Sequence, residues 1–280
     1  MARNIHASLR DGLAGSAKYL TVTLFSLLAF YPFIWIVLTS FKDNFELYDS
    51  PFGLPRGLFV ENYVSAWEIA NLHVNFINSL LITTVVVFVV LLISSMASYV
   101  LCKVWRSSLV YVFLVIGIMI PYHALLIPTF ILVKNLGLIN TRVSLILVYT
   151  AINVSLGVFL LVGFMKSIPH ELEEAAFVDG AGRTRVFFSI IFPLSKPGLA
   201  TVGTLMLLTS WNEFIYANVL ISRAAAKTLT QGIAAMQGEY FTNYGMMAAG
   251  LMASIVPVTV IYILFQENVI RGMAAGAIKG

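Results

Sequence analysis

Long apolar runs dominate the chain, and most charged residues fall between them. Five stretches contain no Asp, Glu, Lys or Arg, and a sixth is interrupted only by Glu213. A transmembrane helix needs about 20 apolar residues, because about 30 Å of hydrocarbon is crossed at about 1.5 Å per residue. The pattern therefore predicts six transmembrane helices, near 19–39, 76–101, 109–132, 143–165, 198–220 and 245–265.

The composition agrees with this pattern. Hydrophobic residues make up 59% of the 280-residue chain and charged residues 11%, with a mean hydropathy of +0.90. Soluble domains carry about a quarter charged residues. The first apolar run is too long for a signal-peptide core and lacks a small-residue cleavage site, so we expect a retained anchor. The predicted fold is an all-α membrane protein.

The distribution of basic residues predicts the orientation in the lipid bilayer. If both termini lie on one side, that side carries eleven Lys and Arg, and the other side carries six. Cytoplasmic loops are enriched in Lys and Arg, so we expect both termini to be cytoplasmic. The net charge of +4 then suits the inner leaflet, and nothing indicates a nucleic-acid partner. Cys102 is the single cysteine and the four histidines are scattered, so no metal site is predicted.

The spans and loops divide the chain into three parts. Residues 1–75 contain a basic tail, the first span and an external loop, and residues 76–266 form a core of five spans. Residues 267–280 form a cytoplasmic tail. Short surface helices are expected around 61–70 and 228–237, and the largest cytoplasmic loop is 166–197.

That cytoplasmic loop has the sequence pattern of a docking segment. Pro169 suits a first helical turn, and Glu171, Glu173 and Glu174 follow it, where the helix dipole favours negative charge. Glycines then end the helix, and the apolar "VFFSIIF" follows. The pattern predicts a short amphipathic helix, a glycine turn and a second helix that re-enters the membrane.

Two interpretations of the loop are open. Small residues on the helix would admit the backbone of another protein, and the charged residues would pair with it. Alternatively, the helix lies on lipid headgroups. Its glutamates disfavour the second interpretation, because interfacial helices prefer a Lys- and Arg-rich face.

The loop resembles the EAA loop of ABC-importer permeases. The family pattern is Glu-Ala-Ala, three residues, Gly, nine residues, Ile, one residue and Leu-Pro. This chain has Glu174-Ala175-Ala176, then Gly180, Ile190 and Phe192-Pro193, with Phe192 in place of the usual Leu. The stretches "GLINTRVSLILVY" and "SWNEFIYA" resemble the carbohydrate-uptake branch. The end "GMAAGAIKG" resembles the tail of the smaller subunit of maltose-type transporters.

The resemblance implies the type I ABC importer permease fold with a docking function for the loop. In the family, the EAA helix inserts into a groove of a cytoplasmic ATPase subunit. Glu174 would pair with a basic residue there, the alanines would allow close packing, and Gly180 would make the turn. The C-terminal tail would reach toward the ATPase interface. The implied coupling residues are Glu174, Ala175, Ala176, Asp179, Gly180 and Gly182, and the implied tail residues are Gly276, Lys279 and Gly280.

The resemblance also implies partners and a location. The partners are a second, homologous permease subunit (MalF-type), two ATP-binding cassette subunits, an extracytoplasmic sugar-binding protein and the bilayer of a bacterial-type cytoplasmic (inner) membrane. ATP and Mg would be used by the partner subunits, with no cofactor bound by this chain, which lacks a phosphate-binding Gly-x4-Gly-Lys-[Ser/Thr] loop. The chain itself is therefore expected not to be an enzyme.

Polar residues inside the spans are candidates for the transport pathway. Glu213 is the one carboxylate in a predicted span, and Asn212 and Tyr216 lie near it. Such groups face a cavity or a partner, so they either contact a sugar or hold neighbouring helices together. His123 lies between Pro121 and Pro128, where the helix is expected to bend. It either faces the pathway or packs within the bend.

The resulting hypothesis is a permease subunit of an ATP-driven importer for a sugar or oligosaccharide. Glycerol-3-phosphate or a polyol is the alternative substrate within the family. A stand-alone secondary transporter is a further alternative, although ion-coupled transporters usually carry several intramembrane acids. A membrane scaffold would leave the EAA spacing unexplained.

Overall fold

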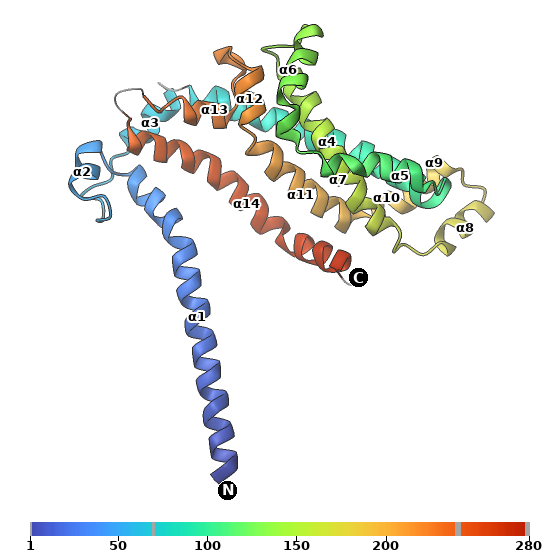
Figure 1. Ribbon diagram of the computed structural model, residues 1–280, viewed down its shortest axis with the longest axis horizontal. Helices are drawn as coiled ribbons and strands as arrows, with labels where there is room; N and C mark the ends of the chain where they lie inside the picture. The colour runs from blue at the N-terminus through green and yellow to red at the C-terminus, as the bar shows by residue number, and fades with distance from the viewer. Residues whose placement is uncertain (1, 69–70, 239–241, 278–280) are drawn as a thin grey trace. The chain divides into compact units, whose positions relative to one another are not determined.

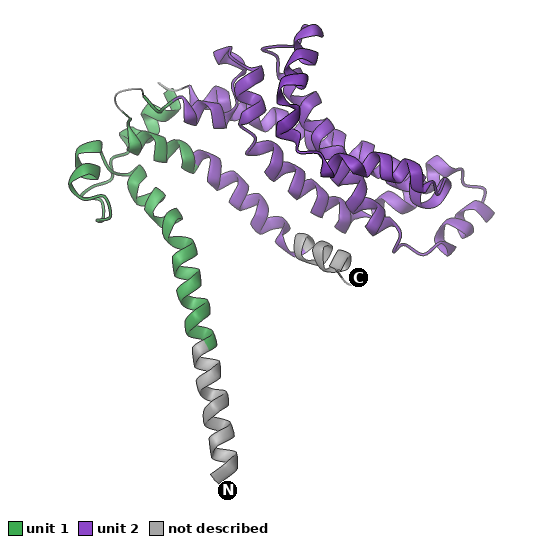
Figure 2. Cartoon of the chain, in the orientation of Figure 1, with its two compact units in different colours: residues 1–70, 236–252 green, residues 71–235, 253–280 purple. Residues whose placement is uncertain are grey.

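The chain folds into helices joined by short loops. The computed structural model describes residues 2–68, 71–238 and 242–277, with side chains between 18 and 267 (Figure 1). Two compact units are present (Figure 2). The first comprises residues 1–70 and 236–252, and the second comprises residues 71–235 and 253–280.

Five long helices supply most of the apolar length. They are α1 (Ala2–Ser40), α4 (Leu72–Tyr99), α7 (Arg142–Met165), α11 (Lys196–Trp211) and α14 (Tyr244–Ala277). The shorter α-helices are α2 (Asn44–Asp49), α3 (Glu61–Glu68), α5 (Ser108–Val115), α6 (Leu126–Asn135), α8 (Glu171–Val178), α9 (Arg183–Val186), α10 (Phe192–Leu194), α12 (Ile215–Leu220) and α13 (Leu229–Ala234). The 3₁₀ and π turns are η1 (Val100–Val104), η2 (Ile116–Met119), η3 (Tyr122–Leu125), η4 (Phe187–Ile191) and η5 (Ala224–Ala226). Helices α3 and α13 confirm the two predicted short helices, but α13 is largely buried instead of lying on the surface.

Four described helices are long and apolar enough to cross a membrane, and two bent pairs bring the number to six. The single spans are 18–40, 72–104, 142–165 and 244–267. They confirm the first, second, fourth and sixth predicted spans to within a few residues. Helix α14 continues to Ala277, so part of the expected C-terminal tail is helical.

The other two spans are bent, and in the third this confirms the bend expected from its prolines. The third bends by 87° between Met119 and Tyr122, where Pro121 cannot donate a backbone hydrogen bond. The fifth was expected to run unbroken over 198–220. Instead α11 ends at Trp211, a short connection follows, and α12 starts at Ile215. The bent pair of apolar helical segments in this region is 183–194 with 196–211, and the bend of 74° lies at Ser195.

A ladder of small side chains joins α4 to α7 in the second unit. Ser94 Oγ donates to the Val154 carbonyl at 3.4 Å, and Ser98 Oγ donates to the Val158 carbonyl at 3.3 Å. One turn further, in η1, the Cys102 thiol donates to the carbonyl of Val162 at 3.6 Å. Donor and acceptor both advance by four residues at each step, so the two helices run parallel. Small polar residues allow close backbone approach in membrane proteins and supply such bonds.

Glycines set the distances between the long helices. A Cβ at Gly157 of α7 would meet Ser94 and Val90 of α4, and a Cβ at Gly198 of α11 would meet the Phe164 ring. The buried core around these contacts comes from α4, α7 and α11 and includes Ile82, Val86, Val90, Leu145, Tyr149, Leu161, Val202 and Met206. These three helices form the frame of the second unit.

The first unit is held by backbone acceptors at the end of α1. The Asn62 amide of α3 donates to the carbonyls of Ser40 and Lys42, at 3.0 and 2.8 Å. The buried Lys42 ammonium donates to the Ser50 carbonyl at 2.8 Å. Side chains of α1 between 18 and 34 are largely exposed and apolar, as expected for a helix that faces lipid.

We expect Gly157→Leu to destabilise the protein by about 1–3 kcal/mol, because overpacking forces tightly packed neighbours apart. The measurement is the thermal midpoint of the detergent-solubilised protein. Gly163→Leu is the matched control, since a Cβ at Gly163 of the same helix meets nothing within 4 Å. Equal losses for both variants would contradict the close α4–α7 contact.

Candidate functional site

The EAA segment folds as helix α8, a glycine turn and helix α9 (Figure 1). Gly180 has a φ of +79°, a backbone conformation that favours glycine. The Gly180 amide donates to the Phe177 carbonyl and the Ala181 amide donates to the Ala176 carbonyl, at 3.0 and 2.9 Å. This pair of bonds is a Schellman motif, which ends a helix at a left-handed residue. The predicted helix and turn are therefore confirmed, although α8 starts two residues after Pro169.

One face of α8 and the turn is open to solvent. Glu174, Ala175 and Asp179 are exposed, and Ala176 is half-buried. Gly180 and Gly182 are exposed as well. Val178 is apolar yet 87% exposed. All the coupling residues expected from the sequence except Ala176 thus lie on the surface of this segment, with charged, small and apolar groups side by side.

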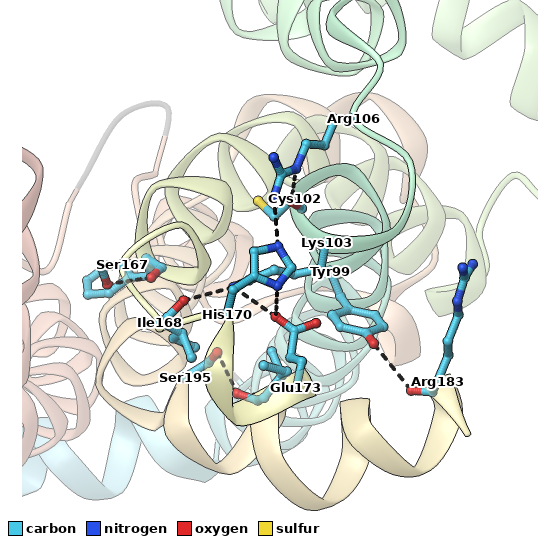
Figure 3. Close-up of polar contacts among 12 residues, drawn as sticks. Tyr99, Cys102, Lys103, Arg106, Ser167, Ile168, His170, Glu173, Arg183 and Ser195 are labelled. Atoms are coloured by element: carbon cyan, nitrogen blue, oxygen red, sulfur yellow. Dashed lines mark hydrogen bonds and ion pairs between the residues drawn. The ribbon is translucent and has the colours of Figure 1, made fainter. Parts of the chain in front are cut away.

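The opposite face of α8 carries a buried ion pair. The Glu173 carboxylate lies 2.9 Å from the Lys103 ammonium, and the two side chains are only 2% and 4% exposed (Figure 3). His170 Nδ1 lies 3.5 Å from the same carboxylate oxygen. The sequence predicted only a dipole-related role for Glu173. Burial of two adjacent charges instead makes Glu173 part of the interior.

Further contacts hold the loop to the C-terminal end of the α4 span. Lys103 also donates to the Ile168 carbonyl at 2.8 Å, and Arg106 Nη2 lies 2.7 Å from His170 Nε2 (Figure 3). On the α9 side, the Tyr99 hydroxyl lies 3.5 Å from the Arg183 carbonyl. The Tyr99 and Phe187 rings are 5.3 Å apart. Both arms of the EAA segment are therefore attached to the same helix end.

Sequence reasoning missed Lys103 as a partner of this segment. It had been counted only among the basic residues that set the orientation. Lys103 and Glu173 are 70 positions apart, and no local pattern pairs them. The sequence also does not distinguish Glu173 from Glu171 and Glu174 as the buried glutamate.

Glu213 acts as a structural acceptor between helices. Its carboxylate accepts from the Tyr149 hydroxyl at 2.7 Å, and from the backbone amides of Tyr216 and Ala217 at 2.8 and 3.1 Å. The two amides belong to the first turn of α12, where backbone N–H groups have no partner within the helix. The Glu213 carboxylate supplies that partner. The Tyr216 hydroxyl donates to the Tyr122 carbonyl at 2.6 Å, beside the bend of the third span.

A cavity of about 580 Å³ lies beside Glu213. Its lining is mainly apolar and includes the polar side chains of Tyr122, Tyr149, Asn153, Thr209, Glu213 and Tyr216. The sequence had singled out the last two. His123 does not line this cavity; it is exposed, with its ring 4.0 Å from the Tyr122 ring. Asn212 is also exposed, and its amide donates to the Leu208 carbonyl.

The expected C-terminal contact residues are mostly outside the described part of the chain. Gly276 lies in the backbone of α14. Lys279 and Gly280 lie outside the described residues.

The fold matches those of solved ABC importers. One such structure is a bacterial ABC transporter involved in the import of the acidic polysaccharide alginate. The two chains superpose with a TM-score of 0.78 at 22% sequence identity, and the alignment covers 92% of this chain and 96% of that chain. The MetNI methionine ABC transporter gives a TM-score of 0.51 at 20% identity, covering 74% of this chain and 94% of that one. At these identities the likeness concerns the fold.

Curated relatives align along nearly the whole chain. The diacetylchitobiose uptake system permease protein NgcG of Streptomyces coelicolor is 33% identical, covering 98% of this chain and 92% of the relative. The melibiose/raffinose/stachyose import permease protein MelC of Bacillus subtilis is 34% identical over 90% and 92%. The trehalose/maltose transport system permease protein MalG of Thermococcus litoralis is 31% identical over 92% and 94%.

A family model gives the same assignment. Residues 90–274 match the model described as the binding-protein-dependent transport system inner membrane component. The match spans every residue that lines the cavity and the complete EAA segment. The chain therefore belongs to this family of membrane transport permeases, with the helical fold of an ABC importer permease.

Proposed function

We propose that this chain is one permease subunit of an ATP-driven importer that moves a sugar or oligosaccharide delivered by an extracytoplasmic binding protein. The observation that carries the proposal is the exposed EAA surface of α8 and its turn, in a chain that belongs to a binding-protein-dependent permease family. The sugar class is supported by the relatives NgcG, MelC and MalG, which are sugar permeases and share about a third of their residues with this chain along almost their full length.

Coupling to the ATPase would use the exposed face of α8. Glu174 would meet a cation in a groove of the ATPase subunit, and the small side chains of Ala175 and Ala176 would let the groove wall come close. Gly180 makes the turn that returns the chain to the membrane, since its φ of +79° suits glycine. A side chain at Gly182 would enlarge this surface.

The partners follow from the same proposal. Two ATP-binding cassette subunits would carry out ATP hydrolysis with Mg, and a second, homologous permease subunit would complete the pathway. The excess of Lys and Arg on the side of the EAA loop supports a cytoplasmic location for that loop and for both termini in the bacterial inner membrane. The tail residues Gly276, Lys279 and Gly280 would then lie on the ATPase side.

The cavity beside Glu213 would form part of the pathway wall. Its tyrosine, amide and hydroxyl side chains suit the hydroxyl groups of a sugar, and apolar side chains around them suit the sugar ring. The three donors on Glu213 favour a positioning role for the carboxylate over direct contact with substrate. Such an engaged carboxylate also gives little support to ion-coupled transport.

We expect Glu174→Lys to abolish the sugar-stimulated part of ATP hydrolysis while leaving the protein in the membrane, because reversed charge prevents docking at an exposed site. ATP hydrolysis is measured on the purified complex while binding protein loaded with candidate sugars is titrated. Glu61→Lys, at an exposed glutamate in the first turn of α3 and outside the EAA segment, is the control. A Glu174→Lys complex that responds normally to sugar would overturn the docking proposal.

Glu213→Gln should lower the maximal transport rate by a similar factor for every transported sugar, with little change in KM. The amide has one acceptor oxygen where the carboxylate has two, so at least one donor at the start of α12 is lost, at about 1–3 kcal/mol. Uptake kinetics with two sugars provide the measurement. A change of KM for one sugar alone would instead assign Glu213 to substrate contact.

A further inference from the structure

We propose that Lys103 and Glu173 form a positioning joint that transmits the movement of helix α8 to the α4–α7 pair. The joint consists of the buried ion pair, its contacts to Ile168 and His170, and the contact of His170 with Arg106. This inference rests on the proposed coupling function of α8. It assigns a role to two residues that lie outside the exposed docking surface.

The first argument is the division of α8 into two faces. Glu173 and Glu174 are adjacent, and successive residues of an α-helix are separated by about 100° around the axis. Glu174 is exposed, whereas the Glu173 side chain is 2% exposed and points toward Lys103 (Figure 3). One glutamate is therefore available to an ATPase subunit while its neighbour is committed to the permease.

The second argument is the energetic character of the pair. A buried ion pair is poor evidence for stability, because desolvation of both charges offsets their attraction, and an apolar pair of similar volume is often as stable. What the ionic pair adds is a defined geometry. Each charge is costly to bury without the other, so α8 is held in one register against η1 as long as both stay buried.

The third argument is that Lys103 contacts two parts of the loop. Its ammonium binds the Ile168 carbonyl in the turn before α8 and the Glu173 carboxylate inside α8. His170 is the N-cap residue of α8. Its ring contacts Glu173 through Nδ1 and Arg106 through Nε2. A rotation or translation of α8 would have to break these contacts or carry η1 with it.

The fourth argument is continuity with the transmembrane frame. Cys102 is the last donor of the ladder that joins α4 to α7, and Lys103 is the next residue along the chain. Val162, which accepts from Cys102, is followed within one turn by the loop that Lys103 contacts. A displacement of α8 is therefore passed through these contacts to α7, which also lines the cavity beside Glu213.

The test is the number of sugar molecules transported per ATP hydrolysed by the complete complex in proteoliposomes. We expect Glu173→Gln and Lys103→Met each to lower this ratio by about tenfold, within the range of coupling free energies between linked sites. The double variant Lys103→Met with Glu173→Leu should restore the amount of assembled complex and its thermal midpoint, but not the ratio. The exchanged pair Lys103→Glu with Glu173→Lys should recover part of the ratio.

Glu61→Gln is the matched control, because Glu61 is an exposed glutamate in the first turn of α3, outside the EAA segment; it should keep the wild-type ratio. A double apolar variant that couples like the wild type would show that the pair only fills space, and would overturn the proposal. An exchanged pair no better than the single variants would contradict the pairwise contact.

Failure of the joint and failure of the proposed function give different results. If Glu174→Lys removes the response to sugar while the Glu173 variants couple normally, docking stands and only the joint is wrong. If Glu174→Lys has no effect, the coupling function on which the joint depends is itself wrong.

Discussion

The contact between α4 and α7 depends on a constraint of the bilayer, where a polar group finds no water and must bind another part of the protein. Three small side chains spaced by four residues meet three carbonyls with the same spacing, and Gly157 leaves the room for that approach. A larger side chain on either helix would separate them. Because α11 packs against both, the frame of the second unit follows from this parallel contact.

The frame continues into the coupling segment without an intervening flexible linker. The ladder ends at Cys102, and Lys103 binds the loop before α8 and then α8 itself. On the other arm, Tyr99 contacts Arg183 and Phe187. The EAA segment is thus attached through both of its arms to the end of the α4 span, which is the arrangement required if movement of a docked partner is to change the transmembrane helices.

The sequence predicted the elements whose signal is local. Hydropathy identified four straight spans, because about 20 consecutive apolar residues have few other interpretations, and the pattern around Glu174 and Gly180 identified the helix and the glycine turn of the EAA segment. Hydropathy could not separate one straight helix from two pieces, so the ends of α11 and α12 around Asn212 were misplaced. Glu213 was recognised as unusual, but its donors come from α7 and α12. The partnership of Lys103 with Glu173 joins distant segments, and a single sequence contains no pattern for it.

The most direct test of the central claim is uptake of radiolabelled sugar into proteoliposomes that contain the complete complex. Sugar-loaded binding protein is supplied outside the vesicles, on the side opposite the ATPase subunits. The account predicts accumulation that requires hydrolysable ATP on the ATPase side and that continues after proton and sodium gradients are collapsed. Uptake that survives without ATP and stops when an ion gradient is removed would contradict it, and would identify the chain as a secondary transporter.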